Sequence, residues 1–427
     1  VLGKPFSVSH VDGEGKNAKI HAYRLAGPGQ HDAAHTAVIA RLVQRLDDLV
    51  AVRRLLRDEV EHDELEVART EQPLAPAAAT VSAAEREELE ACIDARGAYV
   101  SPGFLNVHIH GCVGADTMDD DPEAIRKMQL FQAETGVTSF LPTTMTYDFP
   151  TLGRAFRHMR EAMAREEGAR VLGCHMEGPF ISPAKKGAQA EKNIAKADFA
   201  KIAPYQDIVK IITVAPEELH DGGQFIADCH AHGIVVSLGH TAADYATARQ
   251  AIEEYGAKHI THLFNAMTGL HQRRPGVVGA ALDTDANCEL IVDNVHIHPA
   301  VQRIVYRLKK DHLILITDSL RACGLGDGPS ELGGQKVFVK GTLATLEDGT
   351  IAGSVLCMND GLRIFRKNTG APIEEVVTAV TKTPAKELGL YGELGSLSVG
   401  KNADITIFDD ALKIQRTIVA GRDAYSA

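Results

Sequence analysis

Short apolar runs rich in β-branched residues alternate with amphipathic stretches from residue 104 onward. The stretches between the runs, such as 121–136 and 241–256, carry apolar positions at helical spacing and end at glycine, as helices commonly do. A succession of such units predicts an α/β protein built as a (β/α)₈ TIM-type barrel, with a doubly wound open sheet as the alternative. The predicted strands are 104–110, 138–144, 170–178, 209–217, 233–241, 259–267, 288–297 and 312–319.

The end of the chain follows a different pattern. Residues 395–424 contain two alternating runs with no helical stretch between them, which predicts strands of a small β-domain. Residues 333–354 predict a β-hairpin that leaves the barrel after its last strand.

The beginning of the chain is less regular. Asp12 and Gly13 fit the turn of a hairpin, apolar positions within 36–72 have helical spacing, and 71–85 has the composition of a linker. We therefore expect an N-terminal segment that contains part of the small β-domain and a helical extension, then the catalytic barrel, then the C-terminal strands of the small domain. The expected bounds are 1–100, 101–385 and 386–427.

Composition narrows the class of protein. Hydrophobic residues make up 44% and charged residues 24%, which is ordinary for a globular enzyme. No apolar run approaches the ~20 residues that span a bilayer, and the first residues lack the apolar stretch of a secretory signal, so we expect a cytoplasmic protein. The seven cysteines are scattered without a Cys-x-x-Cys pair, which predicts reduced thiols.

The charge balance argues against two kinds of partner. A net charge of −12 disfavours nucleic acid and anionic membranes as main partners. To bind an anionic small-molecule substrate, the site would need a few cationic side chains that overcome the repulsion from the negative net charge.

Metal-ligating and acid–base side chains follow the ends of five predicted strands. A single histidine there is usually a hydrogen-bonded polar residue, but the joint placement predicts a metal site, because catalytic groups of a barrel gather at the carboxyl ends of its strands. His259 lies three residues before His262 and would face away, so we set it aside; His296 and His298 share a face and fit substrate orientation instead. The predicted site residues are His108, His110, Glu177, His240, His262 and Asp318.

This donor set indicates a type of chemistry. Imidazole and carboxylate suit Zn²⁺ or Fe²⁺, and three or four protein ligands leave a position for water, whose pKa the ion lowers towards ~7. A carboxylate nearby, for which Asp318 is placed, can take the proton of that water and pass it to a leaving group. The pattern therefore predicts hydrolysis of an amide or a related C–N bond.

Several motifs resemble a known family. The stretches IDARGAYVSPGFLNVHIHG and GSLSVGKNADITIFD resemble the amidohydrolase superfamily, whose chain ends meet in a small β-sandwich beside the barrel. More narrowly, HMEGPFISPAKKGAQ, SLGHT, THLFNAMTGLHQRRPGVVGAAL, ITDSLRACG and EDGTIAGS resemble the N-acetylglucosamine-6-phosphate deacetylase family. The resemblance covers roughly residues 93–410, whereas the helical spacing near the N-terminus departs from the strands with which that family usually opens.

The resemblance implies roles for individual residues. Glu177, His240 and His262 would hold the main metal ion, His108 and His110 would take part in a second site, and Asp318 would be the general base and acid. One or two ions of Zn²⁺ or Fe²⁺ per subunit are implied. The implied substrate-binding residues are Ala188, Gln189, Asn265, Ala266, Arg273, His296, Ile351, Ala352 and Gly353.

Two of these positions have particular consequences. In relatives the arginine at the position of Arg273 binds phosphate across a homodimer, so a homodimer is implied here. Gln189 stands where some members carry a histidine that polarises the acetyl carbonyl, and glutamine can only donate a neutral hydrogen bond.

The implied reaction is hydrolysis of N-acetylglucosamine 6-phosphate to glucosamine 6-phosphate and acetate. The alternatives are an amidohydrolase acting on a different amide or on a cyclic C–N bond, and a catalytically silent metal-binding barrel.

Overall fold

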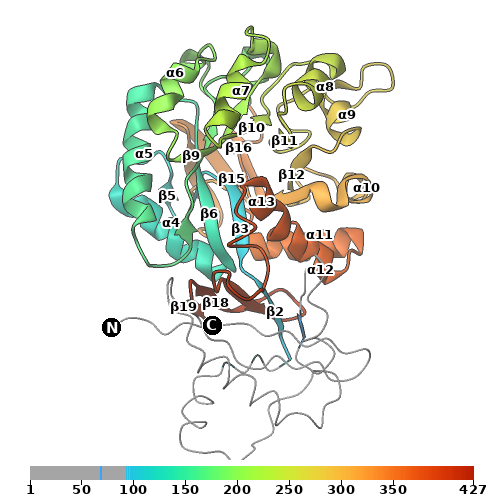
Figure 1. Ribbon diagram of the computed structural model, residues 1–427. Coiled ribbons are helices and arrows are strands. Elements are labelled where there is room, and N and C mark those ends of the chain that lie inside the picture. Colours follow the sequence, from blue (N-terminus) through green and yellow to red (C-terminus); the bar gives the residue numbers. More distant parts are fainter. Residues whose placement is uncertain (1–67, 70–92, 94, 96) are drawn as a thin grey trace, which may run out of the picture.

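A computed structural model describes residues 68–69, 93, 95 and 97–427. Its centre is a set of eight parallel strands surrounded by helices (Figure 1). Each strand overlaps one of the eight predicted runs, so the predicted succession of strands is confirmed. A short strand, β7 (Arg170–Val171), pairs with one side of the set. In their order around the barrel the strands are β13 (Leu313–Ile316), β12 (Asn287–Ile291), β11 (His259–Ile260), β10 (Val235–Leu238), β9 (Val209–Val214), β8 (Cys174–Glu177), β6 (Val137–Thr144) and β3 (Phe104–Ile109).

Hydrogen bonds between the ends of the first and last strands bring the set close to a closed barrel. The Asp318 amide donates to the carbonyl of His108 at 2.9 Å, and the His110 amide donates to the carbonyl of Ser319 at 2.9 Å. An open doubly wound sheet would keep its edge strands apart, so the barrel prediction is confirmed and the alternative is wrong.

The barrel strands read as continuous apolar runs because helices cover them on the outside and side chains fill the inside. All four residues of β13 are buried, for example. Aspartates start several helices: Asp148 accepts from the Thr151 amide and Asp244 from the Thr247 amide, each at 2.8 Å.

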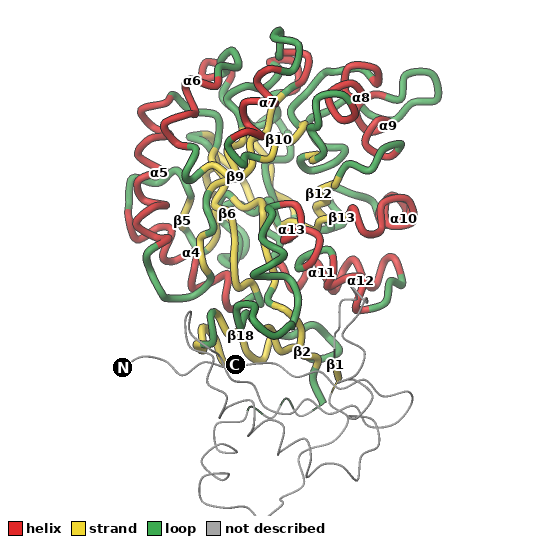
Figure 2. Tube along the Cα trace, viewed as in Figure 1, coloured by secondary structure: helices red, strands yellow, loops and turns green. Residues whose placement is uncertain are grey.

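Figure 2 shows that the helices surround the strands. They are α4 (Pro122–Glu134), α5 (Phe149–Met163), α6 (Phe199–Ile202), α7 (Gln224–Ala231), α8 (Tyr245–Glu253), α9 (Gly276–Leu282), α10 (Pro299–Lys309), α11 (Met358–Thr369), α12 (Ile373–Thr378) and α13 (Lys382–Glu387), with 3₁₀ turns at Pro183–Lys185, Glu191–Asn193, Ala203–Tyr205, Pro216–Glu218 and Lys310–His312.

An antiparallel excursion follows the last barrel strand. The predicted hairpin is confirmed as β15 (Gln335–Lys340) and β16 (Leu343–Leu346), and an unpredicted strand, β14 (Gly328–Leu332), extends it to a three-stranded sheet. The first strand, GPSEL, has no apolar alternation that would reveal it, and it forms because all of its residues pair with β15. A tiny hairpin, β4 (Gly111–Cys112) and β5 (Ala115–Asp116), follows the first barrel strand.

Segments from both ends of the described chain meet in a second sheet below the barrel, as the resemblance implied (Figure 1). Two of its residues, Ala68–Arg69, lie within the stretch 36–72 where we expected a helix, and there that prediction is wrong because the two residues pair with Tyr99 and Val100. The rest of that stretch, the hairpin at Asp12 and the linker lie outside the described residues. In order the strands are β1 (Ala68–Arg69), β2 (Tyr99–Pro102), β17 (Ile405–Phe408), β18 (Ile414–Val419) and β19 (Arg422–Ser426).

Among the described helices, none is both long enough and apolar enough to cross a membrane.

All cysteines except Cys92 lie within the described residues, and these are free thiols. The expected domain bounds stay predictions.

Candidate metal centre

The predicted site residues come together at the carboxyl ends of the barrel strands. Nε2 of His240 and Nε2 of His262 each lie 3.1 Å from Oε1 of Glu177. The two Nε2 atoms also lie 3.1 Å from each other. These three buried residues form the first half of the site.

His108 and His110 form the second half and face the same carboxylate. Nε2 of His110 lies 3.4 Å from Oε2 of Glu177 and 3.2 Å from Oδ1 of Asp318. Nε2 of His108 lies 3.5 Å from Oε1 of Glu177 and 3.5 Å from Oδ1 of Asp318. Glu177 therefore belongs to both groups: its Oε1 faces His240, His262 and His108, and its Oε2 faces His110.

The distances between these side chains are better explained by a bound divalent cation than by hydrogen bonds alone. Two nitrogens bound at ~2.0–2.1 Å to one tetrahedral ion lie about 3.3 Å apart, close to the separation of the Nε2 atoms of His240 and His262. Nε2 of His108 is fully buried and has no hydrogen-bond partner, although it faces two carboxylates. A buried polar nitrogen without a partner is costly, and a cation would satisfy it.

In His110 and His240 the opposite ring nitrogen is held in the state that metal binding requires. Nδ1 of His110 donates to the carbonyl of Thr143 at 3.2 Å, and Nδ1 of His240 donates to the carbonyl of Lys185 at 3.0 Å. A carbonyl only accepts, so the proton resides on Nδ1 and the lone pair on Nε2 is directed into the site.

Three site residues have left-handed backbone conformations. His240, His262 and Asp318 have φ of +49°, +29° and +46°. Such conformations cost ~1–3 kcal/mol each in residues other than glycine and gather at functional sites. They also explain why the predicted strand 259–267 ends at Ile260: the chain turns at His262 so that its side chain faces inward.

The electrostatics describe a compact charged cluster. Burial raises the pKa of Glu177, but the charge of His240 and hydrogen bonds from the histidines outweigh it and hold this pKa well below its usual range. Burial lowers the pKa of His262, but the hydrogen bond to Glu177 and the neighbouring carboxylates raise it to about 9. The raised pKa values of His110 and His262 favour protons on these two rings without a metal ion, so metal binding would release protons.

The chain matches the model of the amidohydrolase family over residues 99–423. An N-acetylglucosamine-6-phosphate deacetylase of Bacillus subtilis (strain 168) is 42% identical over 334 residues, which cover 76% of this chain and 84% of that protein. This chain belongs to the N-acetylglucosamine-6-phosphate deacetylase family of the amidohydrolases. An N-acetylgalactosamine-6-phosphate deacetylase of Escherichia coli O157:H7 is 36% identical, with 75% of this chain and 86% of that one covered.

Solved structures of the deacetylase family have the same fold. The enzyme of Thermotoga maritima superposes with a TM-score of 0.71 at 36% identity and covers 77% of this chain and 89% of its own. The enzyme of Pasteurella multocida gives a TM-score of 0.74 at 33% identity, and the match covers 78% of this chain and 88% of that one.

Gln189, where some members of the deacetylase family carry histidine, contacts the shared carboxylate. Its amide nitrogen donates to Oε2 of Glu177 at 2.5 Å, and its amide oxygen accepts from the Thr146 amide at 2.7 Å. The neighbouring Ala188 carbonyl accepts from the Gln335 side chain of β15. The contact assigns Gln189 a role in holding Glu177.

The implied sugar-binding residues flank the cluster. Asn265 donates from its side chain to the His262 carbonyl at 3.1 Å. The Ala266 carbonyl accepts from the Thr241 amide at 3.1 Å, directly after His240. These bonds place Asn265 and Ala266 in the turns that carry two of the site histidines.

The loop after β16 reaches the backbone of Asp318. Ile351 is 40% exposed, Ala352 is buried, and a Cβ at Gly353 would lie 3.2 Å from the carbonyl of Asp318. Gly353 has φ of +59°, so both its conformation and its close approach favour glycine.

The two implied phosphate-binding residues are not part of the metal-ligating groups. Nδ1 of His296 donates to Asp293 at 2.7 Å. The Arg273 side chain is exposed and forms no ion pair with the described residues.

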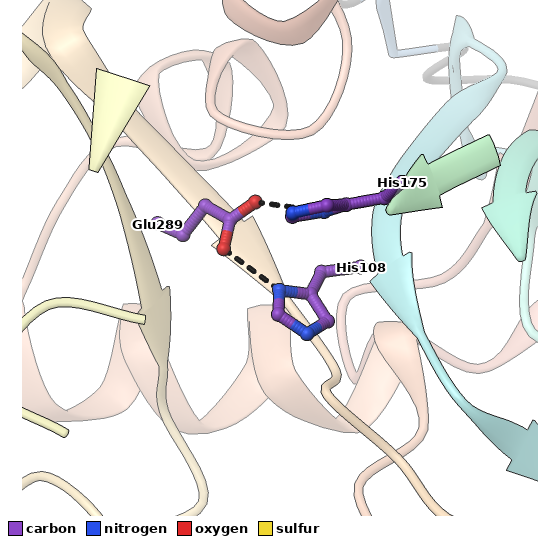
Figure 3. A group of neighbouring side chains, drawn as sticks. All are labelled: His108, His175 and Glu289. Carbon is purple, nitrogen blue, oxygen red and sulfur yellow. Dashed lines mark hydrogen bonds and ion pairs between the residues drawn. The ribbon is translucent and has the colours of Figure 1, made fainter. Parts of the chain in front are cut away.

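Sequence reasoning missed two residues directly behind the cluster, His175 and Glu289. Both are fully buried, and Glu289 accepts from Nδ1 of His108 at 2.9 Å (Figure 3). A glutamate within the apolar run of β12 was a usable signal, because a carboxylate seldom lies in a buried strand without charged partners. His259, which we set aside, indeed lies outside the cluster and pairs with Glu289 at 3.1 Å.

Proposed function

We propose that this protein hydrolyses N-acetylglucosamine 6-phosphate to glucosamine 6-phosphate and acetate. The supporting observation is the cluster in which four histidine Nε2 atoms and both oxygens of Glu177 converge beside Asp318. Membership of the deacetylase family supports the same reaction.

The chain offers ligands for one or two ions of Zn²⁺ or Fe²⁺. His240, His262 and Glu177 would hold one ion, and His108 and His110 with the same carboxylate would hold a second. A bound ion would supply a water of lowered pKa and polarise the acetyl carbonyl.

Asp318 is the proposed general base and acid. Its Oδ1 faces Nε2 of His110 at 3.2 Å, so the carboxylate lies at the edge of the cluster where water and the amide would meet. Its amide donates to the His108 carbonyl, and its carbonyl accepts from the Ser354 amide at 2.8 Å, so the backbone that carries the carboxylate is held on both sides. Asp318 would take the proton of the attacking water and give it to the departing amine.

The remaining predicted residues would bind the sugar phosphate. Asn265, Ala266, Ala188 and Gln189 would contact the sugar, together with Ile351, Ala352 and Gly353 from the loop after β16. Arginine is suited to a phosphate dianion, and the exposure of Arg273 agrees with a role across a homodimer. His296 would assist near the phosphate.

Acetate release by the purified protein, supplied with Zn²⁺ or Fe²⁺, tests the proposal. The assay compares N-acetylglucosamine 6-phosphate with the same sugar lacking phosphate. Turnover of the phosphorylated sugar alone supports the proposal, turnover of both removes the phosphate requirement, and turnover of neither by the metal-loaded protein contradicts it.

A second candidate substrate is N-acetylgalactosamine 6-phosphate, because a relative that is 36% identical carries that name. The same assay with this sugar, which differs at one hydroxyl, gives the ratio of kcat/KM for the two.

A further inference from the structure

Glu289 is a buried carboxylate behind the metal centre. It lies on β12, has no exposed surface, and faces both His108 and His175 (Figure 3). A buried carboxylate is unfavourable unless it is paired and hydrogen-bonded, so its partners indicate its role.

The carboxylate of Glu289 contacts both halves of the proposed metal centre. Its Oε2 accepts from Nδ1 of His108 at 2.9 Å and from the backbone amide of His262 at 3.1 Å. Its backbone carbonyl also accepts from the Leu263 amide at 2.9 Å. One residue thus holds a side chain from one half and the left-handed turn of the other.

The group of His108, His175 and Glu289 does not form a further metal site. Nδ1 of His175 donates to the carbonyl of Val107 at 3.0 Å, and Nε2 of His175 bonds to the hydroxyl of Thr213 at 2.8 Å. Nδ1 of His175 therefore carries a proton and has no lone pair for a cation. The contacts of Glu289 are hydrogen bonds that orient neighbouring groups.

The charge of Glu289 is balanced from the side away from the metal centre. Its Oε1 accepts from Nε2 of His259 at 3.1 Å, and Nδ1 of His259 in turn donates to Glu387 at 3.2 Å. Burial lowers the pKa of His259, but the hydrogen bonds to both carboxylates raise it to about 10. The second oxygen of Glu289 is therefore hydrogen-bonded on the side away from the metal centre.

We propose that Glu289 is a positioning residue that prepares both halves of the metal centre at once. By accepting from Nδ1 it keeps the proton of His108 there and directs the Nε2 lone pair towards the cluster. By accepting from the His262 amide it stabilises the backbone that aims His262 at Glu177. This inference rests on the proposed metal dependence but not on the proposed substrate.

Metal affinity measured without substrate tests the inference. Zn²⁺ is titrated against a competing chelator into metal-free wild type, Glu289→Gln and Glu387→Gln. The second variant is a matched control, because Glu387 contacts His259 but none of the metal centre. Loss of an outer partner of this kind weakens binding ~10–100-fold, which we expect for Glu289→Gln only. Equal affinity of Glu289→Gln and wild type would overturn the proposal, as would equal losses in both variants.

Glu289→Asp keeps the inference testable if the glutamine variant does not fold. It retains the charge but withdraws the carboxylate by one methylene from His108. ¹⁵N spectra of histidine-labelled, metal-free protein report the tautomer of each ring. We expect His108 to be protonated on Nδ1 in wild type and to become a mixture in the variant, and an unchanged His108 signal would contradict the proposal. If wild type binds Zn²⁺ normally but releases no acetate, the proposed substrate is wrong and the proposed role of Glu289 is unaffected.

Discussion

The Nε2 atoms of His240 and His262 lie 3.1 Å apart, and both face the same oxygen of Glu177. In this geometry a shared cation would replace the protons that otherwise hold the three groups together. Chelator treatment is therefore expected to abolish acetate release, and added Zn²⁺ or Fe²⁺ is expected to restore it.

His262→Ala tests the same relationship in the intact chain. Loss of an outer partner weakens metal affinity ~10–100-fold, and we expect a larger loss here because a direct ligand is removed. Metal content measured by elemental analysis should fall accordingly. His158→Ala is the control, since His158 pairs with the exposed Asp120 outside the cluster. Full metal content in His262→Ala would show that the first half of the site holds no ion.

Asp318→Asn should separate metal binding from chemistry. The amide keeps the size of the side chain but cannot accept and deliver a proton, so kcat should fall by ~10²–10⁴-fold. Metal content and KM should stay near those of wild type. Near-full activity of this variant would mean that Asp318 is not the base.

The barrel and its central residues could be predicted from the sequence because both follow from local patterns. Strands buried on both faces appear as apolar runs, and catalytic groups follow directly after them. The strand β14 and the role of Glu289 could not be predicted in this way. Each is determined by a partner distant in sequence: β15 for the strand, and His108 and His262 for the carboxylate.

Arg273→Ala tests phosphate recognition. A charge-assisted hydrogen bond contributes ~1.5–3 kcal/mol, so kcat/KM for the phosphorylated sugar should fall roughly 10–100-fold, mainly through KM. Arg303→Ala removes an exposed arginine that contacts the Asn368 carbonyl, and should change nothing. An unchanged KM in Arg273→Ala would exclude this side chain from phosphate binding.

The stability of the metal-free protein should depend on His259. Its folded-state pKa of about 10 lies above the ordinary value of 6.5, so its ion pairs stabilise the fold fully below pH ~6.5 and less as pH rises towards 10. At ~1.4 kcal/mol per pKa unit the contribution is at most ~5 kcal/mol. The Tm difference between wild type and His259→Gln should therefore shrink between pH 6.5 and 10. A difference that stays constant would mean that His259 is neutral.

Gln189→Ala should weaken metal binding through Glu177. The glutamine amide fixes Oε2 of Glu177 and is itself fixed by the Thr146 amide, so its removal frees the carboxylate to rotate between the two halves of the site. Gln335→Ala is the matched control. The side chain of Gln335 on β15 donates to the carbonyl of Ala188, the residue before Gln189, and forms no described hydrogen bond with Glu177. We expect a ~10-fold loss of Zn²⁺ affinity in Gln189→Ala and a smaller loss in Gln335→Ala. Equal losses would show that the loop as a whole, rather than the contact with Glu177, determines the affinity.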